Sequence, residues 1–108
     1  MSYKVFLTQD AERDLEALYE FVFEHDSPGS AEQLLDKVGA TLEKLADFPE
    51  RGNHPKELAA LGITDYRELL FKPYRIIYRV LDKRVYVYLV VDGRRDMRAL
   101  LQRRLLTR

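Results

Sequence analysis

The chain has 108 residues, of which 46% are hydrophobic and 33% are charged, and this size and composition fit one small domain spanning residues 1–108. It contains no cysteine, which excludes disulfides, thiolate metal sites and cysteine nucleophiles. No apolar run approaches the roughly 20 residues of a membrane span and no signal peptide is visible, so we expect a cytoplasmic protein without a membrane partner.

Tyr3, Val5 and Leu7 alternate with Lys4 and Phe6, which is the period of a short strand ending at Thr8. Thr8 can cap a helix over residues 9–25, and a second helix begins either after Ser27 or at a capping box from Ser30 to Gln33. This second helix must end at Phe48-Pro49, because proline cannot continue it. The apolar stripes of the two helices are Ala11, Leu15, Leu18 and Val22 in the first, and Leu34, Leu35, Val38, Leu42 and Leu45 in the second.

Residues 49–64 are rich in turn formers, with room for one short helical turn over Lys56 to Leu61. Three strands follow, over residues 66–71, 74–81 and 85–91, and their short connections require antiparallel neighbours. A basic amphipathic helix is expected near the end, with Met97, Leu100, Leu101 and Leu105 on its apolar side. The predicted fold class is α+β: an N-terminal strand, a two-helix hairpin packed on an antiparallel sheet with a three-stranded meander, and a short C-terminal helix.

The charges balance overall but are divided unevenly along the chain. Through His54 there are 5 basic and 12 acidic residues, whereas from Pro55 onward there are 13 basic and 6 acidic residues. The two parts therefore carry net charges of −7 and +7. Such an asymmetry indicates an anionic partner for the basic part.

A two-residue turn at Asp82-Lys83 fixes the pairing of the last two strands. One face would then be apolar and lie under the helices, pairing Val80 with Val85, Tyr78 with Val87, Ile76 with Leu89, and Tyr74 with Val91. The opposite face would pair Arg79 with Tyr86, Ile77 with Tyr88, and Arg75 with Val90. Arginines and tyrosines can simply cover a half-exposed sheet, but five further arginines could extend this basic surface: Arg94, Arg95, Arg98, Arg103 and Arg104.

Arg67 has two possible positions. A two-residue turn at Lys72-Pro73 would place it toward the helices, where it would need a buried acidic partner, whereas a turn one residue longer places it beside Arg79 on the outer face. We prefer the outer face.

Other motifs carry little chemistry. His25 and His54 lack metal-ligand spacing and are interpreted as surface residues, and no hydrolase or phosphate-loop motif is present. Asp92 and Asp96 are interpreted as salt-bridge or capping partners. We expect neither a metal site nor a cofactor.

Several short segments, in this order and spacing, resemble the RelE/ParE superfamily of bacterial type II toxin-antitoxin toxins over almost the whole chain. They are Ala11-Glu12-Arg13-Asp14-Leu15, Phe48-Pro49-Glu50-Arg51-Gly52, Tyr66-Arg67-Glu68-Leu69, Pro73-Tyr74-Arg75-Ile76-Ile77-Tyr78 and Asp92-Gly93-Arg94-Arg95-Asp96. The resemblance implies a growth-inhibitory toxin, of the kind that can stabilise plasmids, neutralised by a cognate antitoxin that wraps its helices and sheet. It also implies that promoter DNA is bound only through the antitoxin.

The superfamily includes ribosome-dependent messenger-RNA endonucleases, similar to RelE, and poisons of DNA gyrase, similar to ParE. Arg75 and Arg95 match basic positions of the nuclease site and Arg67 aligns with a lysine, but Leu69 and Leu101 fall where the nuclease has a lysine and a tyrosine. An arginine titrates too high to act as a general base at neutral pH. This departure favours gyrase as the target, with RNA cleavage and a binding-only or inactive module as alternatives.

The sequence therefore gives two sets of candidate residues, and leaves any catalytic residue unassigned. Candidate phosphate or target contacts are Arg67, Arg75, Arg79, Arg94 and Arg95. Candidate antitoxin contacts are Arg75, Ile77, Arg79, Tyr86 and Tyr88, which would bind an acidic segment that folds on the toxin.

Overall fold

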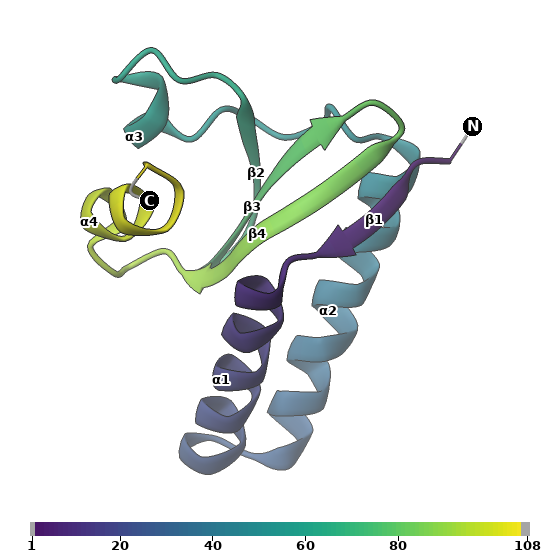
Figure 1. Cartoon of the computed structure of the whole chain (residues 1–108). Helices are drawn as coiled ribbons and strands as arrows, with labels where there is room; N and C mark the ends of the chain where they lie inside the picture. The colour runs from purple at the N-terminus through teal and green to yellow at the C-terminus, as the bar shows by residue number, and fades with distance from the viewer. Residues whose placement is uncertain (1, 107–108) are drawn as a thin grey trace.

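A computed structural model describes residues 2–106 and contains one four-stranded sheet between two groups of helices (Figure 1). The strand order is β1-β4-β3-β2; β1 runs parallel to β4, and the other neighbours are antiparallel. The elements are β1 (Lys4–Leu7), α1 (Gln9–His25), α2 (Pro28–Asp47), α3 (Lys56–Ala59), β2 (Tyr66–Phe71), β3 (Tyr74–Leu81), β4 (Arg84–Asp92), α4 (Met97–Leu101) and the π-helical turn η1 (Gln102–Leu106). The predicted α+β architecture is confirmed.

The ends of the long helices follow from their capping residues. The Thr8 hydroxyl accepts a hydrogen bond from the Ala11 N–H at 3.2 Å, and the Ser27 hydroxyl accepts one from the Ser30 N–H at 3.0 Å. Of the two starts considered for the second helix, the structure therefore uses Ser27, with Pro28 in the first helical turn where its missing N–H costs nothing. The helix ends at Asp47, with Phe48 as its C-cap immediately before Pro49, as predicted.

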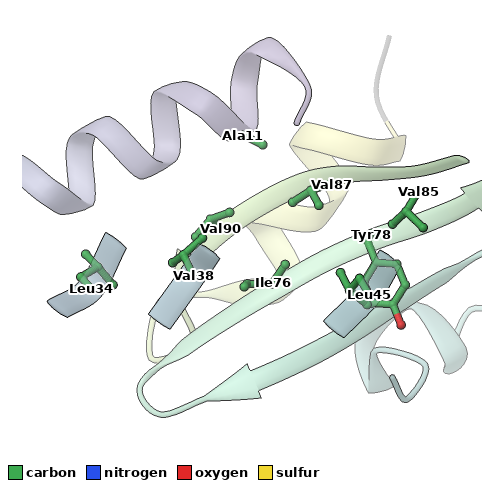
Figure 2. Close-up of a cluster of buried hydrophobic side chains, with 9 residues drawn as sticks. All are labelled: Ala11, Leu34, Val38, Leu45, Ile76, Tyr78, Val85, Val87 and Val90. Atoms are coloured by element: carbon green, nitrogen blue, oxygen red, sulfur yellow. The ribbon is translucent and has the colours of Figure 1, made fainter. Parts of the chain in front are cut away.

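The main hydrophobic core lies between the α1–α2 hairpin and one face of the sheet (Figure 2). Its buried residues are Ala11, Leu34, Val38 and Leu45 from the helices, and Ile76, Tyr78, Val85, Val87 and Val90 from the strands. Burial of these side chains is the largest favourable contribution to folding, because each removes apolar surface from water.

The predicted pairing of β3 with β4 is correct near the turn and wrong beyond it. Val80 pairs with Val85 and Tyr78 with Val87 as predicted, but the register then shifts, so that Ile77 lies opposite Leu89 and Tyr88 is an extra residue. This β-bulge reverses the orientation of the following residues. Val90 therefore faces the helices, and Leu89 does not.

A second apolar cluster covers part of the opposite, outer face of the sheet. Ile77, Leu89 and Val91 are buried there under α3 and α4. The residues that cover them are Leu58, Met97, Leu100 and Leu101. The prediction of an open outer face is thus wrong for this half of the sheet, and Ile77 in particular is completely buried.

The β2–β3 connection decides the position of Arg67. Phe71 pairs with Tyr74, so the turn has two residues and Arg67 lies opposite Tyr78, on the side of the helices. The preferred position beside Arg79 is therefore wrong. Arg67 does not need an acidic partner there, because its Nη1 donates to the carbonyl oxygens of Glu50 and Gly52 at 3.2 and 2.9 Å.

Gly52 packs tightly against β2 and β3. Its N–H donates to the Tyr78 hydroxyl at 3.1 Å, and a methyl group built at Gly52 would lie 2.5 Å from the Glu68 carbonyl oxygen. The segment Phe48-Pro49-Glu50-Arg51-Gly52 is thus held against the sheet by Arg67 and Tyr78. No helix within residues 2–106 has the length and apolarity to cross a bilayer.

We expect Gly52→Ala to lower the free energy of unfolding by about 2 kcal/mol, because the new methyl would collide with backbone that cannot move freely. Gly39→Ala is the matched control: apart from the adjacent backbone of its own helix and its chain neighbours, no atom lies within 4 Å of a methyl group there, and alanine in mid-helix should stabilise by about 1 kcal/mol. Urea unfolding of the two variants measures both effects. Equal stabilities would contradict the close packing at Gly52.

Candidate functional site

Arg75 and Arg79 lie four residues apart on the outer face of β3 but have different surroundings. Arg75 is near the β2–β3 turn and is only 8% exposed. Arg79 is near the other end of the strand and is partly exposed. The difference follows from the acidic residues that each arginine meets.

Arg75 is held by two glutamates of the same chain. Its Nη1 and Nη2 donate to the two carboxylate oxygens of Glu57, in α3, at 2.9 and 2.8 Å. Its Nε donates to Oε1 of Glu68, in β2, at 2.7 Å. Glu68 lies on the same face as Arg75 because it pairs with Ile77, two residues along β3.

This ion cluster persists at neutral pH. The hydrogen bonds from Arg75 lower the pKa of Glu57, although partial burial opposes the shift. The same hydrogen bonds raise the pKa of Arg75, so the guanidinium stays charged. The stem of Arg75 is also enclosed, because a methyl group at Gly93 would lie 2.7 Å from its Cδ. Arg75 was predicted to be an exposed contact for phosphate or antitoxin; it is instead buried and paired with Glu57 and Glu68.

The open half of the outer face carries an aromatic and cationic row that crosses all four strands. In register, Phe6 pairs with Tyr86, Tyr86 with Arg79, and Arg79 with Tyr66. The rings of Phe6 and Tyr86 stack with centroids 5.5 Å apart, and the Arg79 guanidinium lies 5.9 Å from the Tyr66 ring centroid. We call these four residues the outer row.

Asp65 and Tyr88 contact residues of the outer row. Arg79 forms an ion pair with Asp65 at 3.2 Å, and both partners are partly exposed. Tyr88 contacts the edge of the Tyr66 ring, with centroids 5.5 Å apart. Burial raises the pKa of Tyr66, so its phenol remains neutral at physiological pH. Phe6 was not predicted as part of this surface, although its alternation with Val5 and Leu7 could have indicated it.

The segment after β4 keeps several arginines exposed. Arg94 is paired with Asp92, with a shortest distance of 2.6 Å, yet its side chain is 77% exposed. Within residues 2–106, the side chains of Arg95, Arg98 and Arg103 are exposed and form no hydrogen bond or ion pair. We call these three the C-terminal arginines. The interpretation of Asp92 and Asp96 is confirmed, since Asp92 binds Arg94 and Asp96 caps α4.

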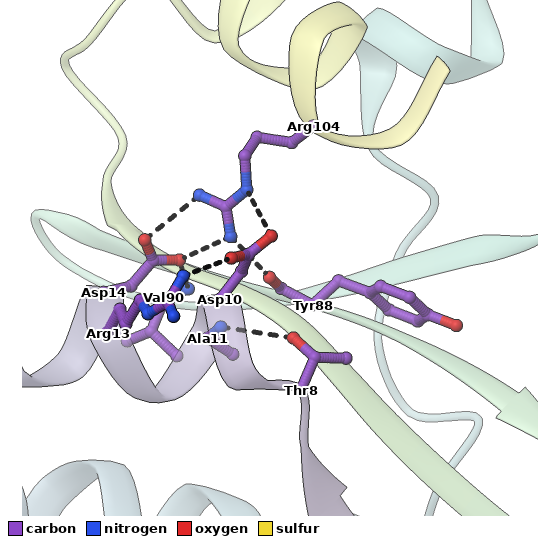
Figure 3. A network of polar contacts seen from close by, with 8 residues as sticks. All are labelled: Thr8, Asp10, Ala11, Arg13, Asp14, Tyr88, Val90 and Arg104. Atoms are coloured by element: carbon purple, nitrogen blue, oxygen red, sulfur yellow. Dashed lines mark hydrogen bonds and ion pairs between the residues drawn. The ribbon is translucent and has the colours of Figure 1, made fainter. Parts of the chain in front are cut away.

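Arg104 departs from the predicted basic surface because it turns inward to α1 (Figure 3). It donates to both carboxylate oxygens of Asp14 at 3.0 Å and to the Tyr88 carbonyl oxygen at 2.9 Å. Asp14 also accepts the Val90 N–H at 3.2 Å. Sequence reasoning missed this contact because Asp14 and Arg104 are 90 residues apart in the chain.

The positions that supply further groups in the RelE-like nuclease site are apolar here. Leu69 packs against the main core, and Leu101 is buried in the second cluster. Neither can donate or accept a proton.

Two sequence comparisons match this chain to ParE toxins over most of its length. The family model described as the ParE toxin of the type II toxin-antitoxin system, parDE, matches residues 5–97. Toxin ParE3 of Caulobacter vibrioides is 25% identical over 96 residues, which cover 89% of this chain and 92% of that protein.

Solved structures share the fold. A chromosomal ParDE toxin-antitoxin system from P. aeruginosa superposes with a TM-score of 0.70 at 18% identity, covering 84% of this chain and 96% of that one. The RelBE2 toxin-antitoxin complex from Mycobacterium tuberculosis has a TM-score of 0.58 at 25% identity, covering 85% and 99%. A mutant of E. coli toxin RelE in the free state has a TM-score of 0.59 at 20% identity, covering 93% of each chain.

We expect Arg75→Met to reduce the free energy of unfolding at pH 7 by about 3 kcal/mol, because two poorly solvated carboxylates lose their cation. The contribution of Glu57 is present above its unfolded pKa, ordinarily 4.5, and is lost as the pH falls through its lowered folded value. The difference between wild type and variant should therefore shrink in acid. Urea titrations from pH 7 downward measure it.

Arg79→Met is the control for this prediction. Its ion pair with Asp65 is exposed, so the loss should stay below about 1 kcal/mol. A stable Arg75→Met protein at pH 7 would show that the ion cluster is not structural.

Proposed function

The chain belongs to the ParE toxin family of type II toxin-antitoxin systems, and on that premise we propose that it arrests growth by poisoning DNA gyrase rather than by cutting messenger RNA. The observation that carries the choice is the enclosure of Arg75 by Glu57 and Glu68. A phosphate could reach this guanidinium only by displacing two carboxylates that already satisfy its donors. The leucines at positions 69 and 101 support the same choice, since RNA cleavage needs proton transfer.

The C-terminal arginines are the proposed contact with the target. Arg95, Arg98 and Arg103 belong to one continuous segment, and their exposed side chains form no hydrogen bond or ion pair within residues 2–106. Arg94 adds an exposed guanidinium, which forms an ion pair with Asp92. Poisoning needs binding but no chemical step by the toxin, and a cationic surface suits phosphates or carboxylates of a gyrase–DNA complex.

The antitoxin is the second partner of the toxin, and we propose that an acidic segment of it lies across the outer row. Arg79, Tyr86 and Tyr88 remain from the predicted contacts, and Phe6 joins them. Ile77 and Arg75 leave the set because both are buried. Aromatic rings and a partly exposed arginine can bury apolar side chains while pairing with carboxylates. In this arrangement the toxin–antitoxin complex binds promoter DNA through the antitoxin.

The proposed target is tested by inducing the toxin without antitoxin and following protein synthesis and DNA breaks in the same culture. We expect early DNA breaks and filamentation, with protein synthesis falling later. Rapid translational arrest with cut transcripts would instead establish the nuclease, and normal growth with folded toxin would indicate a binding-only or inactive module.

Replacing Arg95, Arg98 and Arg103 by alanine should weaken toxicity at least about tenfold, because charged contacts at an interface contribute both to encounter and to affinity. The matched control replaces Lys37, Lys44 and Arg51, which are also exposed cations but lie in the acidic part of the chain. Toxicity is measured as the inducer concentration that halves growth. A similar effect of both triple variants would remove the C-terminal arginines from the proposed contact.

For the antitoxin, Arg79→Glu with Tyr86→Ala should weaken binding by a factor of about 100 or more, since an aromatic anchor and a charge are both lost. Titration calorimetry with the cognate antitoxin measures the change. Lys72→Glu with Leu70→Ala serves as control, because both residues are exposed near the β2–β3 turn. Unchanged binding of the first variant would refute the placement on the outer row.

A further inference from the structure

Helices α3 and α4 lie side by side over the outer face of the sheet (Figure 1), and an open cavity lies between their exposed sides. We call it the α3–α4 cavity. Its volume is about 460 Å³, within the range of known ligand pockets. The residues that line it are Lys56, Glu57, Ala60, Leu61, Arg98 and Gln102.

Two pairs of residues form the walls of the α3–α4 cavity. Lys56 and Ala60 are one helical turn apart, since the Ala60 N–H donates to the Lys56 carbonyl oxygen at 3.0 Å. Arg98 and Gln102 are likewise four residues apart, in α4 and at the start of η1. Residues four apart lie one above the other on a helix, so the two walls face each other across the cavity.

The α3–α4 cavity has an apolar lining that the protein core does not use. Leu61 is 64% exposed, whereas Leu58, three residues earlier, is 1% exposed in the second cluster. Ala60 is exposed as well, and the methylene stems of Lys56 and Arg98 extend the apolar surface around it. A partner side chain that entered the cavity would therefore remove apolar surface from water.

The charges around the α3–α4 cavity are unbalanced toward the positive. Its acidic residue, Glu57, already accepts hydrogen bonds from Arg75 with both carboxylate oxygens, at 2.9 and 2.8 Å. The side chains of Lys56 and Arg98 are exposed and form no hydrogen bond or ion pair with any residue in the described range 2–106. Two cations without a counterion thus border an apolar cavity, which favours carboxylates beside an apolar group.

We propose that the α3–α4 cavity binds a segment of gyrase in which a large apolar side chain is flanked by aspartate or glutamate. The apolar side chain would contact Ala60 and Leu61, and the flanking carboxylates would pair with Lys56 and Arg98. Arg98 also belongs to the C-terminal arginines, so the cavity continues the contact already proposed for the target. This inference rests on the proposed function in taking gyrase as the partner.

The composition of the lining favours a protein segment over the DNA bound by gyrase. A phosphate backbone would use the two cations, but it has no apolar side chain to cover Leu61. Unpaired bases bind by stacking on aromatic rings, and none of the residues that line the cavity is aromatic. The lining therefore matches an acidic and apolar peptide segment on both counts.

The test compares Leu61→Asp with the control Leu70→Asp, because the two leucines are 64% and 59% exposed and only Leu61 lines the cavity. Binding of each purified toxin to immobilised gyrase is measured by biolayer interferometry, with and without duplex DNA. We expect Leu61→Asp to lose at least about tenfold in affinity and the control less than about threefold, because the new carboxylate would face those of the partner. The loss should be the same with and without DNA.

A second variant, Lys56→Glu, tests the charge at the cavity rim. It should weaken gyrase binding at least about tenfold at low salt and less at high salt, because exposed charges are screened. Toxicity should fall with both cavity variants, whereas affinity for the cognate antitoxin should stay at the wild-type value. Circular dichroism and urea unfolding establish that each variant is folded.

Four results would overturn the proposal. Wild-type gyrase affinity of both cavity variants would exclude the cavity from the contact, and a loss seen only with DNA would indicate a phosphate in it. A loss of antitoxin affinity with unchanged gyrase affinity would assign the cavity to the antitoxin. A wild-type toxin dimer that Lys56→Glu dissociates would assign it to a second copy.

Failure of the gyrase target itself gives a different pattern. In that case wild type, Leu70→Asp and both cavity variants would all fail to bind gyrase, which would refute the target and the cavity contact together. Binding by wild type and Leu70→Asp with loss in both cavity variants supports the two proposals, whereas equal binding by all four proteins refutes only the cavity contact.

Discussion

One extra residue in β4, Tyr88, determines how this small sheet supports two separate apolar clusters. Without the bulge, Val87, Leu89 and Val91 would all face the α1–α2 hairpin, and the outer face would present only Ile77, Tyr88 and Val90 to α3 and α4. With it, Leu89 and Val91 turn outward and anchor the second cluster. The bulge occurs just where β1 has ended and α1 has begun, so on that edge of β4 no strand lies beside Val90 to accept its N–H. The Asp14 carboxylate accepts that N–H instead, and it simultaneously binds Arg104.

Internal pairing decides which charges remain for partners. Arg75 and Arg104 both belong to the basic part of the chain, yet each is bound by carboxylates of the protein itself, Arg75 by glutamates and Arg104 mainly by Asp14. Both pairs are partly buried, where an unpaired charge would be costly. These residues therefore stabilise α3 and the C-terminal turn against the sheet. The cations that remain available to a partner lie in the last segment of the chain and on the open half of the outer face.

Local features of the fold could be predicted from the sequence because local chemistry fixes them. Thr8 and Ser27 cap helices, Pro49 ends one, and Asp82 adopts the positive φ of 56° that a tight two-residue turn favours. The bulge could not be predicted, since residues 87–91 are all apolar or aromatic and satisfy either register equally well. The partners of Arg75 were also out of reach, because Glu57 is 18 residues away in a turn-rich segment. The predicted position of Arg67 was wrong because a buried guanidinium does not require a carboxylate: backbone carbonyl oxygens accept its hydrogen bonds here.

The arginine motif of β3 shows why family resemblance fixes a fold more firmly than a chemistry. The segment Tyr74-Arg75-Ile76-Ile77-Tyr78 resembles a motif of the nuclease members of the superfamily, and four of its residues have structural contacts here. Ile76 and Tyr78 fill the main core, Ile77 fills the second cluster, and Arg75 binds α3 to the sheet through Glu57. An arginine that binds a phosphate must instead be exposed and must not be paired with a carboxylate of its own chain. By that criterion the chemistry of this fold depends less on the arginine than on the carboxylates placed opposite it, since Glu57 and Glu68 together accept the hydrogen bonds of Arg75 that a phosphate would need.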